Sequence, residues 1–433
     1  MTTSRLAAAK AMAPTLGVFM VLVLASNRWG QSLLDDGVQL RILAPPIIGR
    51  FRFGPPGGAL ALVPPIAIGL ILLRQLPRLA ATLRWRHLLM LSAVATAVWA
   101  VSLALVDGPS GLTRPMELPG HYLLDIDRID SPGAFLRGFT DHIGEYGTHI
   151  RSHPPGLVLL LWAMDRVGLG GSGWAAALVI VGGASAAPAV LLTTRELAGD
   201  ALARRALPFV VLAPAALYVA STGDALFAGV AAWGVAAVAI ATGRHGRRRD
   251  GLAIAGGAGF GVALLLSYGA ALVLVLPLVV IVVRRSWRVA VLAALGGSGV
   301  FAVAALAGFW WVEGLFATRL EYLESVASVR PYGYFLLANL AALALIVGPA
   351  TLAGIQRLRG PLALVVGPAL AMVVLADLSG MSKGEVERIW LPFAVFLLPA
   401  GALAAEEPSR VRLWLVAQVT LAILITTAVR THW

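Results

Sequence analysis

The segment between Asp107 and His153 holds most of the residues whose types suit acid–base and phosphate chemistry. It contains four of the seven histidines in the sequence, together with carboxylates, arginines and two tyrosines. A carboxylate can deprotonate a hydroxyl nucleophile, and an arginine can bind two phosphate oxygens at once. A solvated loop with incidental charges is the alternative interpretation. The polar side chains are His121, Tyr122, Asp125, Asp127, Arg128, Asp130, Arg137, Asp141, His142, Glu145, Tyr146, His149, Arg151 and His153.

Two spacings in this segment could serve a metal ion. His149 and His153 are four residues apart, which on a helix would place both imidazoles on one face. A double proline follows directly, however, and a residue before proline avoids helical geometry. Asp125 and Asp127 form a pair that could hold a divalent cation, but on a helix their carboxylates would diverge. The sequence therefore predicts no dedicated metal site and leaves a divalent cation open as a cofactor.

Three shorter segments add polar residues that the same chemistry could use. Asp224 begins an apolar run, where helix N-capping would also explain it. Lys383 and Arg388, in "KGEVERIWLPF", could bind a phosphate or pyrophosphate, whereas snorkelling at a membrane surface is the simpler alternative for Lys383. The stretch 318–334, "TRLEYLESVASVRPYGY", is typical of an amphipathic helix at a membrane surface, with arginines that could touch lipid head groups.

The elements that must position these residues belong to a membrane protein. Of the 433 residues, 59% are hydrophobic and only 13% are charged, with a mean hydropathy of +0.84. A soluble domain carries about 25% charged residues. The absence of cysteine excludes disulfides, thiolate nucleophiles and cysteine-based metal sites. The composition predicts an all-α integral membrane protein, and the abundance of Arg, Ala, Gly and Val favours a bacterial source.

The apolar runs predict about thirteen transmembrane helices. The run 155–164 is left out, because it is short for a span and meets Asp165 and Arg166 at once. It is predicted to be a short interfacial or re-entrant helix. The predicted spans are 12–26, 58–74, 88–106, 174–193, 207–221, 225–242, 252–267, 270–284, 288–311, 334–354, 361–377, 389–405 and 411–430.

The charge distribution supports this threading. It places 20 of the 34 basic residues, but only 5 of the 22 acidic ones, on the side of the N-terminus, as the positive-inside rule requires of a cytoplasmic face. Counting 155–170 as a span would invert everything that follows. The net charge of +12 is spread in short clusters between apolar runs, which argues against nucleic acid as a partner. The segment 107–153 and the other 17 of the 22 acidic residues are predicted to lie outside.

The stretch from Ser152 to Gly229, beginning "SHPPGLVLLLW", resembles the GT-C superfamily of glycosyltransferases that use polyprenyl-phosphate sugars, near the aminoarabinose and protein O-mannosyl transferases. There an "HPPL"-like motif opens a short helix after the first large outer loop, and an outer "SP…TD" segment follows. These roles would fall to 153–156 and 212–224. The "KGEVERIWLPF" segment is similar to a late segment of bacterial members. The family's acidic "DE" corresponds here to Asp125 followed by Ile126, a departure that leaves Asp127 and Asp130 as rivals.

The resemblance implies transfer of a sugar from a polyprenyl-phosphate carrier to a hydroxyl of a glycan, lipid or protein acceptor. It implies a GT-C-type bundle whose first large outer loop is catalytic and contains short interfacial helices. Asp125 would be the general base, with Asp127 as the alternative, and positive charge would stabilise the departing phosphate. Lys383, Arg388 and Arg151 would supply that charge, and Tyr122, Tyr146, His149, His153, Asp224, Tyr268, Glu385 and Glu387 complete the predicted substrate-binding set.

Three regions follow from this reading. Residues 1–87 would form N-terminal transmembrane helices, and 88–290 the catalytic module with the outer loop 107–170. Residues 291–433 would form the C-terminal helices, with outer segments 313–333 and 377–389. We expect a multi-pass protein of the bacterial cytoplasmic membrane that serves the cell envelope, contacts membrane lipids and has its active site facing outside. The alternatives are a transporter or flippase of a lipid-linked sugar, and a non-catalytic scaffold.

Overall fold

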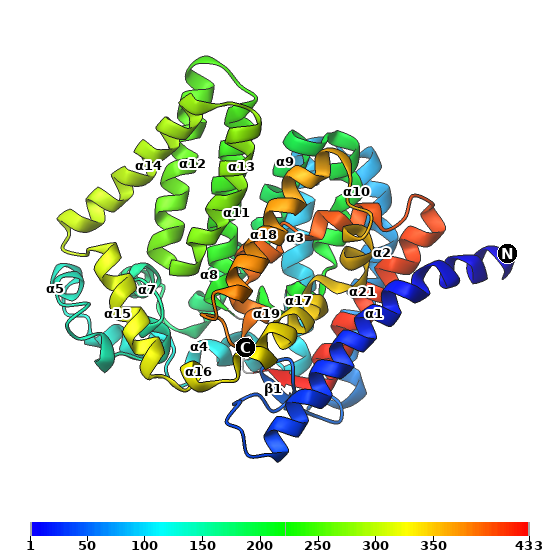
Figure 1. Cartoon of the computed structure of the whole chain (residues 1–433), viewed down its shortest axis with the longest axis horizontal. Coiled ribbons are helices and arrows are strands. Elements are labelled where there is room, and N and C mark those ends of the chain that lie inside the picture. Colours follow the sequence, from blue (N-terminus) through cyan, green and yellow to red (C-terminus); the bar gives the residue numbers. More distant parts are fainter. Residues whose placement is uncertain (1, 221, 432–433) are drawn as a thin grey trace.

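Long apolar helices run side by side through the molecule, and short polar helices gather at one end of them (Figure 1). The computed structural model describes residues 2–220 and 222–431. We call the short helices of residues 105–166 and 311–331 the polar cap. In Figure 1 the cap lies at the lower edge, below the helices that rise from it. The all-α membrane architecture predicted from composition is confirmed.

Ten helical segments in the described residues are long and apolar enough to cross a membrane. Their bounds agree with ten of the predicted spans to within a few residues at most ends, because each contains an apolar run of sufficient length. They are built from α1 (Thr2–Asp35), α2 (Val63–Thr82), α3 (Trp85–Ala104), α8 (Ser172–Ala184) with α9 (Ala186–Ala198), α11 (Gly223–Thr242), α12 (Gly246–Leu266), α14 (Trp287–Leu306), α17 (Tyr332–Ile355), α18 (Ala363–Leu378) and α21 (Pro408–Ala428).

The predicted count of thirteen is not confirmed, because three predicted spans fold as broken helices. The run 207–221 is divided where Pro214 begins a 3-10 turn, and 389–405 is divided at Pro392 and Pro399. Proline lacks the N–H that a continuous helix needs. The broken segments are α10 (Asp200–Val211) with η5 (Pro214–Tyr218), η6 (Tyr268–Leu274) with α13 (Val275–Val283), and α20 (Leu391–Ala394) with η8 (Leu398–Leu403).

The polar cap consists of short helices and 3-10 turns. The 155–164 run forms a helix of 11 residues, too short for a span, as predicted. Apolar side chains of the cap, among them Phe135 and Phe139, form a second core cluster together with side chains at the ends of α8, α11 and α12. The elements are η2 (Leu105–Asp107), α4 (Ser110–Glu117), η3 (Tyr122–Arg128), α5 (Pro132–Arg137), η4 (Ile143–Glu145), α6 (Thr148–Arg151), α7 (Gly156–Arg166), α15 (Trp311–Glu324) and α16 (Val326–Val329).

The remaining elements connect distant parts of the chain. Strand β1 (Gly49–Phe51) pairs antiparallel with β2 (Val429–Thr431), so the segment after α1 is joined to the segment after α21. The turns η1 (Gly58–Leu62) and η7 (Gly360–Leu362) precede α2 and α18, and α19 (Val386–Ile389) follows the loop after α18. The largest core cluster lies among the long helices and includes Trp99, Trp390 and Phe396.

Candidate active site

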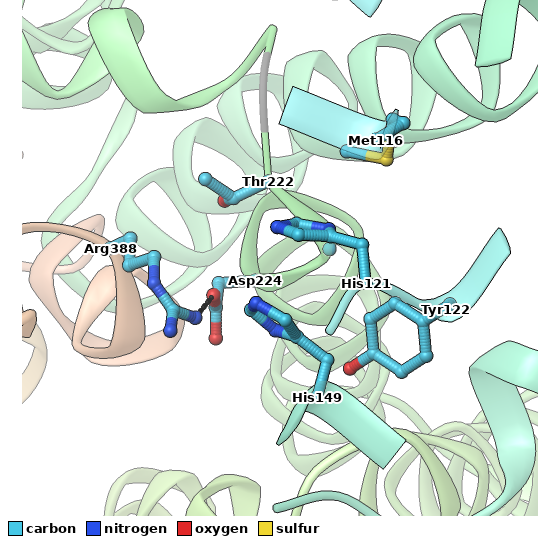
Figure 2. A pocket seen from close by; sticks show the side chains of 8 residues that line it. Met116, His121, Tyr122, His149, Thr222, Asp224 and Arg388 are labelled. Atoms are coloured by element: carbon cyan, nitrogen blue, oxygen red, sulfur yellow. Dashed lines mark hydrogen bonds and ion pairs between the residues drawn. The ribbon is translucent and has the colours of Figure 1, made fainter. Parts of the chain in front are cut away.

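A small pocket lies where the polar cap meets the first turn of α11 (Figure 2). Its walls come from segments far apart in the sequence, all of which the charge distribution had placed on one side of the membrane. They are the end of α4, the start of η3, α6, the start of α11, and α19. The lining residues are Met116, His121, Tyr122, His149, Thr222, Gly223, Asp224 and Arg388.

The charged centre of the pocket is a buried ion pair. Arg388 Nη1 donates to Asp224 Oδ2 at 2.6 Å, and the two side chains are only 8% and 4% exposed. Arg388 Nη2 also contacts the carboxylate of Glu385. Burial opposes the charge of Arg388, but Glu385 and Asp224 outweigh it and raise the pKa of the guanidinium. The pocket therefore holds one permanent positive charge between two carboxylates.

Asp224 lines the pocket with a carboxylate that Arg388 contacts through Oδ2. Asp224 lies in the first turn of α11, where the helix dipole favours negative charge. The Thr222 side chain, at the N-cap, makes no capping bond and instead donates to Tyr218 O at 3.2 Å. Asp224 thus has the placement that a proton acceptor needs.

Two imidazoles form the opposite wall. The rings of His121 and His149 lie 3.9 Å apart between centroids, and Figure 2 shows both turned towards Asp224 and Arg388. Burial lowers the pKa of His121 to about 4, and the charge of Arg388 acts in the same direction. Burial, then Arg388, also lowers the pKa of His149. Both rings are therefore neutral near pH 7, when each can donate one hydrogen bond and accept another.

The "HPPG" stretch places His153 and the cap against the long helices. A Cβ on Gly156 would lie 2.3 Å from Leu265 O, so only glycine allows this approach to the end of α12. A Cβ on Gly223 would lie 2.8 Å from Leu157 Cδ2, so α7 also packs closely on the start of α11. His153 is buried just behind the pocket, with its ring 6.2 Å from that of Tyr122. This packing fixes Asp224 relative to the cap.

Two of the predicted residues in 383–388 adjoin the pocket without lining it. Glu385 has a left-handed backbone, with φ of 61°, and touches Arg388. Glu387 is fully buried and accepts a hydrogen bond from Ile48 N at 2.9 Å. Burial raises the pKa of Glu387 to about 7, although that hydrogen bond opposes the shift. Glu387 ties α19, which carries Arg388, to the segment after α1.

The predicted bases Asp125 and Asp127 do not line the pocket. Asp125 is buried, and its Oδ2 accepts from Gly147 N at 2.7 Å. Its Oδ1 accepts from Arg128 at 3.0 Å, and Arg128 also donates to Glu145 O. Asp125 therefore joins the start of η3 to the segment before α6. Asp127 is exposed on the other side of η3.

Four other predicted residues lie apart from the pocket. Tyr146 packs on Phe139, and Arg151 pairs with Glu321. Tyr268 packs on Trp311, with ring centroids 5.3 Å apart, and Lys383 donates from Nζ to Ser328 O at 2.6 Å. The predicted cluster of Lys383, Arg388 and Arg151 is therefore not assembled in this structure, and only Arg388 is at the pocket.

Met116, His121 and Thr222 line the pocket but were not among the predicted site residues. His121 precedes Tyr122 and was noted only as one of the loop histidines, and Thr222 lies two residues before Asp224. Both could have been found by extending the chosen motifs by a residue or two. Met116 carries no chemical signal that would have singled it out.

The described residues contain no group of three or more His, Asp or Glu side chains arranged to hold a metal ion. The carboxylates nearest the pocket histidines, Asp224 and Glu385, are both bound to Arg388. This arrangement does not fit a divalent cation.

No protein-family model matches the chain, and no curated protein matches it significantly. The solved structures that are similar include the following two. ArnT from Cupriavidus metallidurans in the apo state has a TM-score of 0.41 and 19% identity, covering 66% of this chain and 58% of that one. The Archaeoglobus fulgidus oligosaccharyltransferase, in complex with Zn and sulfate, has a TM-score of 0.41 and 16% identity, covering 78% and 53%. The chain thus spans little more than half the length of either, and residue roles rest on its own pocket.

Proposed function

We propose that the protein is a membrane glycosyltransferase that moves a sugar from a polyprenyl-phosphate carrier to an acceptor hydroxyl. The reaction would take place at the outer face of the bacterial cytoplasmic membrane. The acceptor would be a glycan, a lipid or a protein. The observation that carries the proposal is the pocket at the start of α11, which joins a carboxylate, a buried guanidinium and neutral imidazoles.

The geometry supports an inverting displacement with Asp224 as the general base. Asp224 Oδ1 would take the proton of the acceptor hydroxyl as the hydroxyl oxygen attacks the anomeric carbon. The bond between that carbon and the phosphate oxygen breaks, and its electron pair leaves with the polyprenyl phosphate. His121, His149 and Tyr122 would donate and accept hydrogen bonds around the sugar ring, because they line the pocket beside Asp224.

Arg388 would stabilise the departing phosphate. Its buried guanidinium is the one side chain with a permanent positive charge among the lining residues, and a fixed cation acts most strongly where water is excluded. Its contacts with Asp224 and Glu385 hold it in place before the substrate arrives. Lys383 and Arg151 could join it only by leaving Ser328 O and Glu321.

Asp125 remains the second candidate for the base. The sequence resemblance favours it, whereas its two hydrogen-bonded oxygens and its absence from the pocket lining favour a role in holding η3 against the segment before α6. Asp127 is the third candidate.

The deciding measurement is transfer of radiolabelled sugar from polyprenyl-phosphate donors in membranes that contain Asp224→Asn, Asp125→Asn or Asp127→Asn. We expect Asp224→Asn to lower transfer by roughly 10²- to 10⁴-fold with expression intact, since a general base contributes about that much. Loss confined to Asp125→Asn would move the base into η3 and leave the reaction class standing. Full transfer by all three variants would overturn the mechanism.

Transport of a lipid-linked sugar is the rival function. Transporters place their ionisable residues near the membrane midplane, on helices that are broken there. Asp224, in the first turn of α11, and Arg388, on α19, instead lie beside the polar cap. A wild-type protein that transfers no sugar from any donor, but moves labelled donor across proteoliposomes, would favour transport.

A further inference from the structure

Helix α15 turns its polar side towards the protein. Arg151 donates from Nη1 to Glu321 Oε2 at 3.1 Å, and Thr318 Oγ1 donates to Arg151 O at 3.0 Å. Further along, Tyr322 donates to Gly380 O at 2.8 Å. The hydrogen-bonding groups that an amphipathic helix normally offers to water are here used to hold the cap. The surface that α15 leaves exposed is therefore the apolar one.

Four large apolar side chains form a stripe on that exposed surface. Val312, Phe316, Leu320 and Leu323 are 42%, 58%, 62% and 53% exposed. Their spacing of three and four residues places them on one face of the helix. We call these four residues the apolar stripe. In water such a surface would be costly, because burial of apolar area contributes about 25 cal/mol per Å².

Charged residues flank the apolar stripe. At 100° per residue, Arg319 lies beside one edge, and Glu313 and Glu324 lie beyond the other. All three are exposed. A narrow apolar face between charged edges is the pattern of a helix that lies in the plane of a membrane surface.

The apolar stripe follows directly on α14, whose own surface is apolar and exposed. Only 11% of the apolar window of α14 is buried in the protein, and Val303 and Leu306 at its end are 68% and 89% exposed. The chain then turns sharply at Gly308, whose φ of 103° favours glycine, and passes Trp310 into α15. Figure 1 shows α15 leading directly from the lower end of α14. Tryptophan is enriched at membrane–water interfaces.

We propose that α15 lies in the membrane surface with its apolar stripe among the lipid acyl chains, and that this contact supports the active-site pocket. The occupant of the stripe is bulk lipid, since the exposed surface of α14 that it extends is already a lipid-facing one. The proposal reverses one sequence expectation: the acyl chains, rather than the arginines, are the main lipid contact. It does not depend on the reaction that the pocket carries out.

The connection to the pocket runs through α6. Arg151, held by Glu321 and Thr318 of α15, lies two residues after His149, which lines the pocket. Moving α15 away from α6 would therefore remove the contacts that hold Arg151, at the end of the four-residue helix that carries His149. The membrane contact acts as a positioning element for this wall of the pocket.

The cysteine-free sequence allows a direct test with single introduced cysteines. The variants Phe316→Cys, Leu320→Cys and Leu323→Cys, labelled with an environment-sensitive fluorophore, are reconstituted as full-length protein in phosphatidylcholine–phosphatidylglycerol vesicles. Val303→Cys serves as the matched control within a span, and Asp127→Cys as the matched control on the exposed cap. Quenching is measured with spin-labelled phospholipid and with aqueous iodide.

We expect strong quenching by the spin-labelled lipid and weak quenching by iodide at 316, 320 and 323, as at 303, with the reverse at 127. Iodide quenching at the stripe equal to that at 127 would overturn the proposal. Protection from both quenchers would also overturn it, and would assign the stripe to a protein partner such as a second copy of the chain. Three positions are used so that one poorly folded variant does not decide the result.

Discussion

Two arginine–aspartate pairs, one in the pocket and one between the starts of α12 and α14, have almost the same shortest contact distance and different surroundings. Arg388 and Asp224 are joined at 2.6 Å, and Arg288 and Asp250 at 2.8 Å. The first pair is 8% and 4% exposed, whereas the second is 63% and 26% exposed. The contact distance does not distinguish a site from a surface ion pair. Burial does, because two desolvated charges are retained at a cost that a surface pair does not carry.

The sharpest way to break this comparison is to remove each arginine. Arg388→Met should destabilise the folded state by about 3–5 kcal/mol, because Asp224 and Glu385 would be left without their cation. Arg288→Met should leave the melting temperature unchanged, because Asp250 keeps Arg249 and water as partners. Thermal unfolding in detergent measures both. Equal small changes in the two variants would show that the buried pair is not special.

Acid should destabilise the folded state through two buried histidines at or beside the pocket. Burial lowers the pKa of His121 and of His153 to about 4, from the ordinary histidine value of 6.5. The unfolded chain therefore binds more protons than the folded one between these values. The stabilisation is complete above pH 6.5 and is lost as the pH falls towards 4, by about 2 kcal/mol for each histidine near pH 4.5.

Chemical denaturation between pH 7 and 4.5 tests this, with the double variant His121→Gln, His153→Gln expected to show a flatter pH dependence. His142→Gln is the matched control, since His142 is exposed and pairs with Glu145. A double variant whose stability falls as steeply as that of the wild type would assign the acid sensitivity to other groups.

A smaller effect should appear on the alkaline side. Burial raises the pKa of Glu387 to about 7, so the folded state binds the extra proton. The stabilisation is complete below pH 4.5, the ordinary pKa of glutamate, and is lost as the pH rises through 7. Glu387→Gln keeps an oxygen for Ile48 N and should remove about 1 kcal/mol of the difference in unfolding free energy between pH 6 and 8. An unchanged difference would contradict the assignment.

The sequence was most informative about the membrane helices and the short helix α7. Ten apolar runs were long enough to be recognised, and 155–164 was correctly predicted to be too short for a span, since it forms a helix of 11 residues. The broken runs were predicted as continuous, because hydropathy does not register where Pro214 or Pro392 interrupts a helix that is supported by its neighbours.

The pocket was predictable in part. Tyr122, His149, Asp224 and Arg388 were chosen by residue type and by resemblance, and they line one pocket. The role given to Asp125 depended on its match to the family's acidic "DE". That match cannot show that Gly147 N and Arg128 would occupy both of its oxygens. Contacts between segments more than a hundred residues apart, such as that of Arg388 with Asp224, have no local signal.

The pairing of β1 with β2 has a consequence for biogenesis. Residues 49–51 are synthesised early, but their partners at 429–431 follow the last long helix, and Arg388 is itself made late. Asp224 and the pocket histidines must therefore wait for most of the chain before the ion pair with Arg388 can form. A ribosome that stalls before residue 388 would leave an inserted bundle with an open, unneutralised pocket.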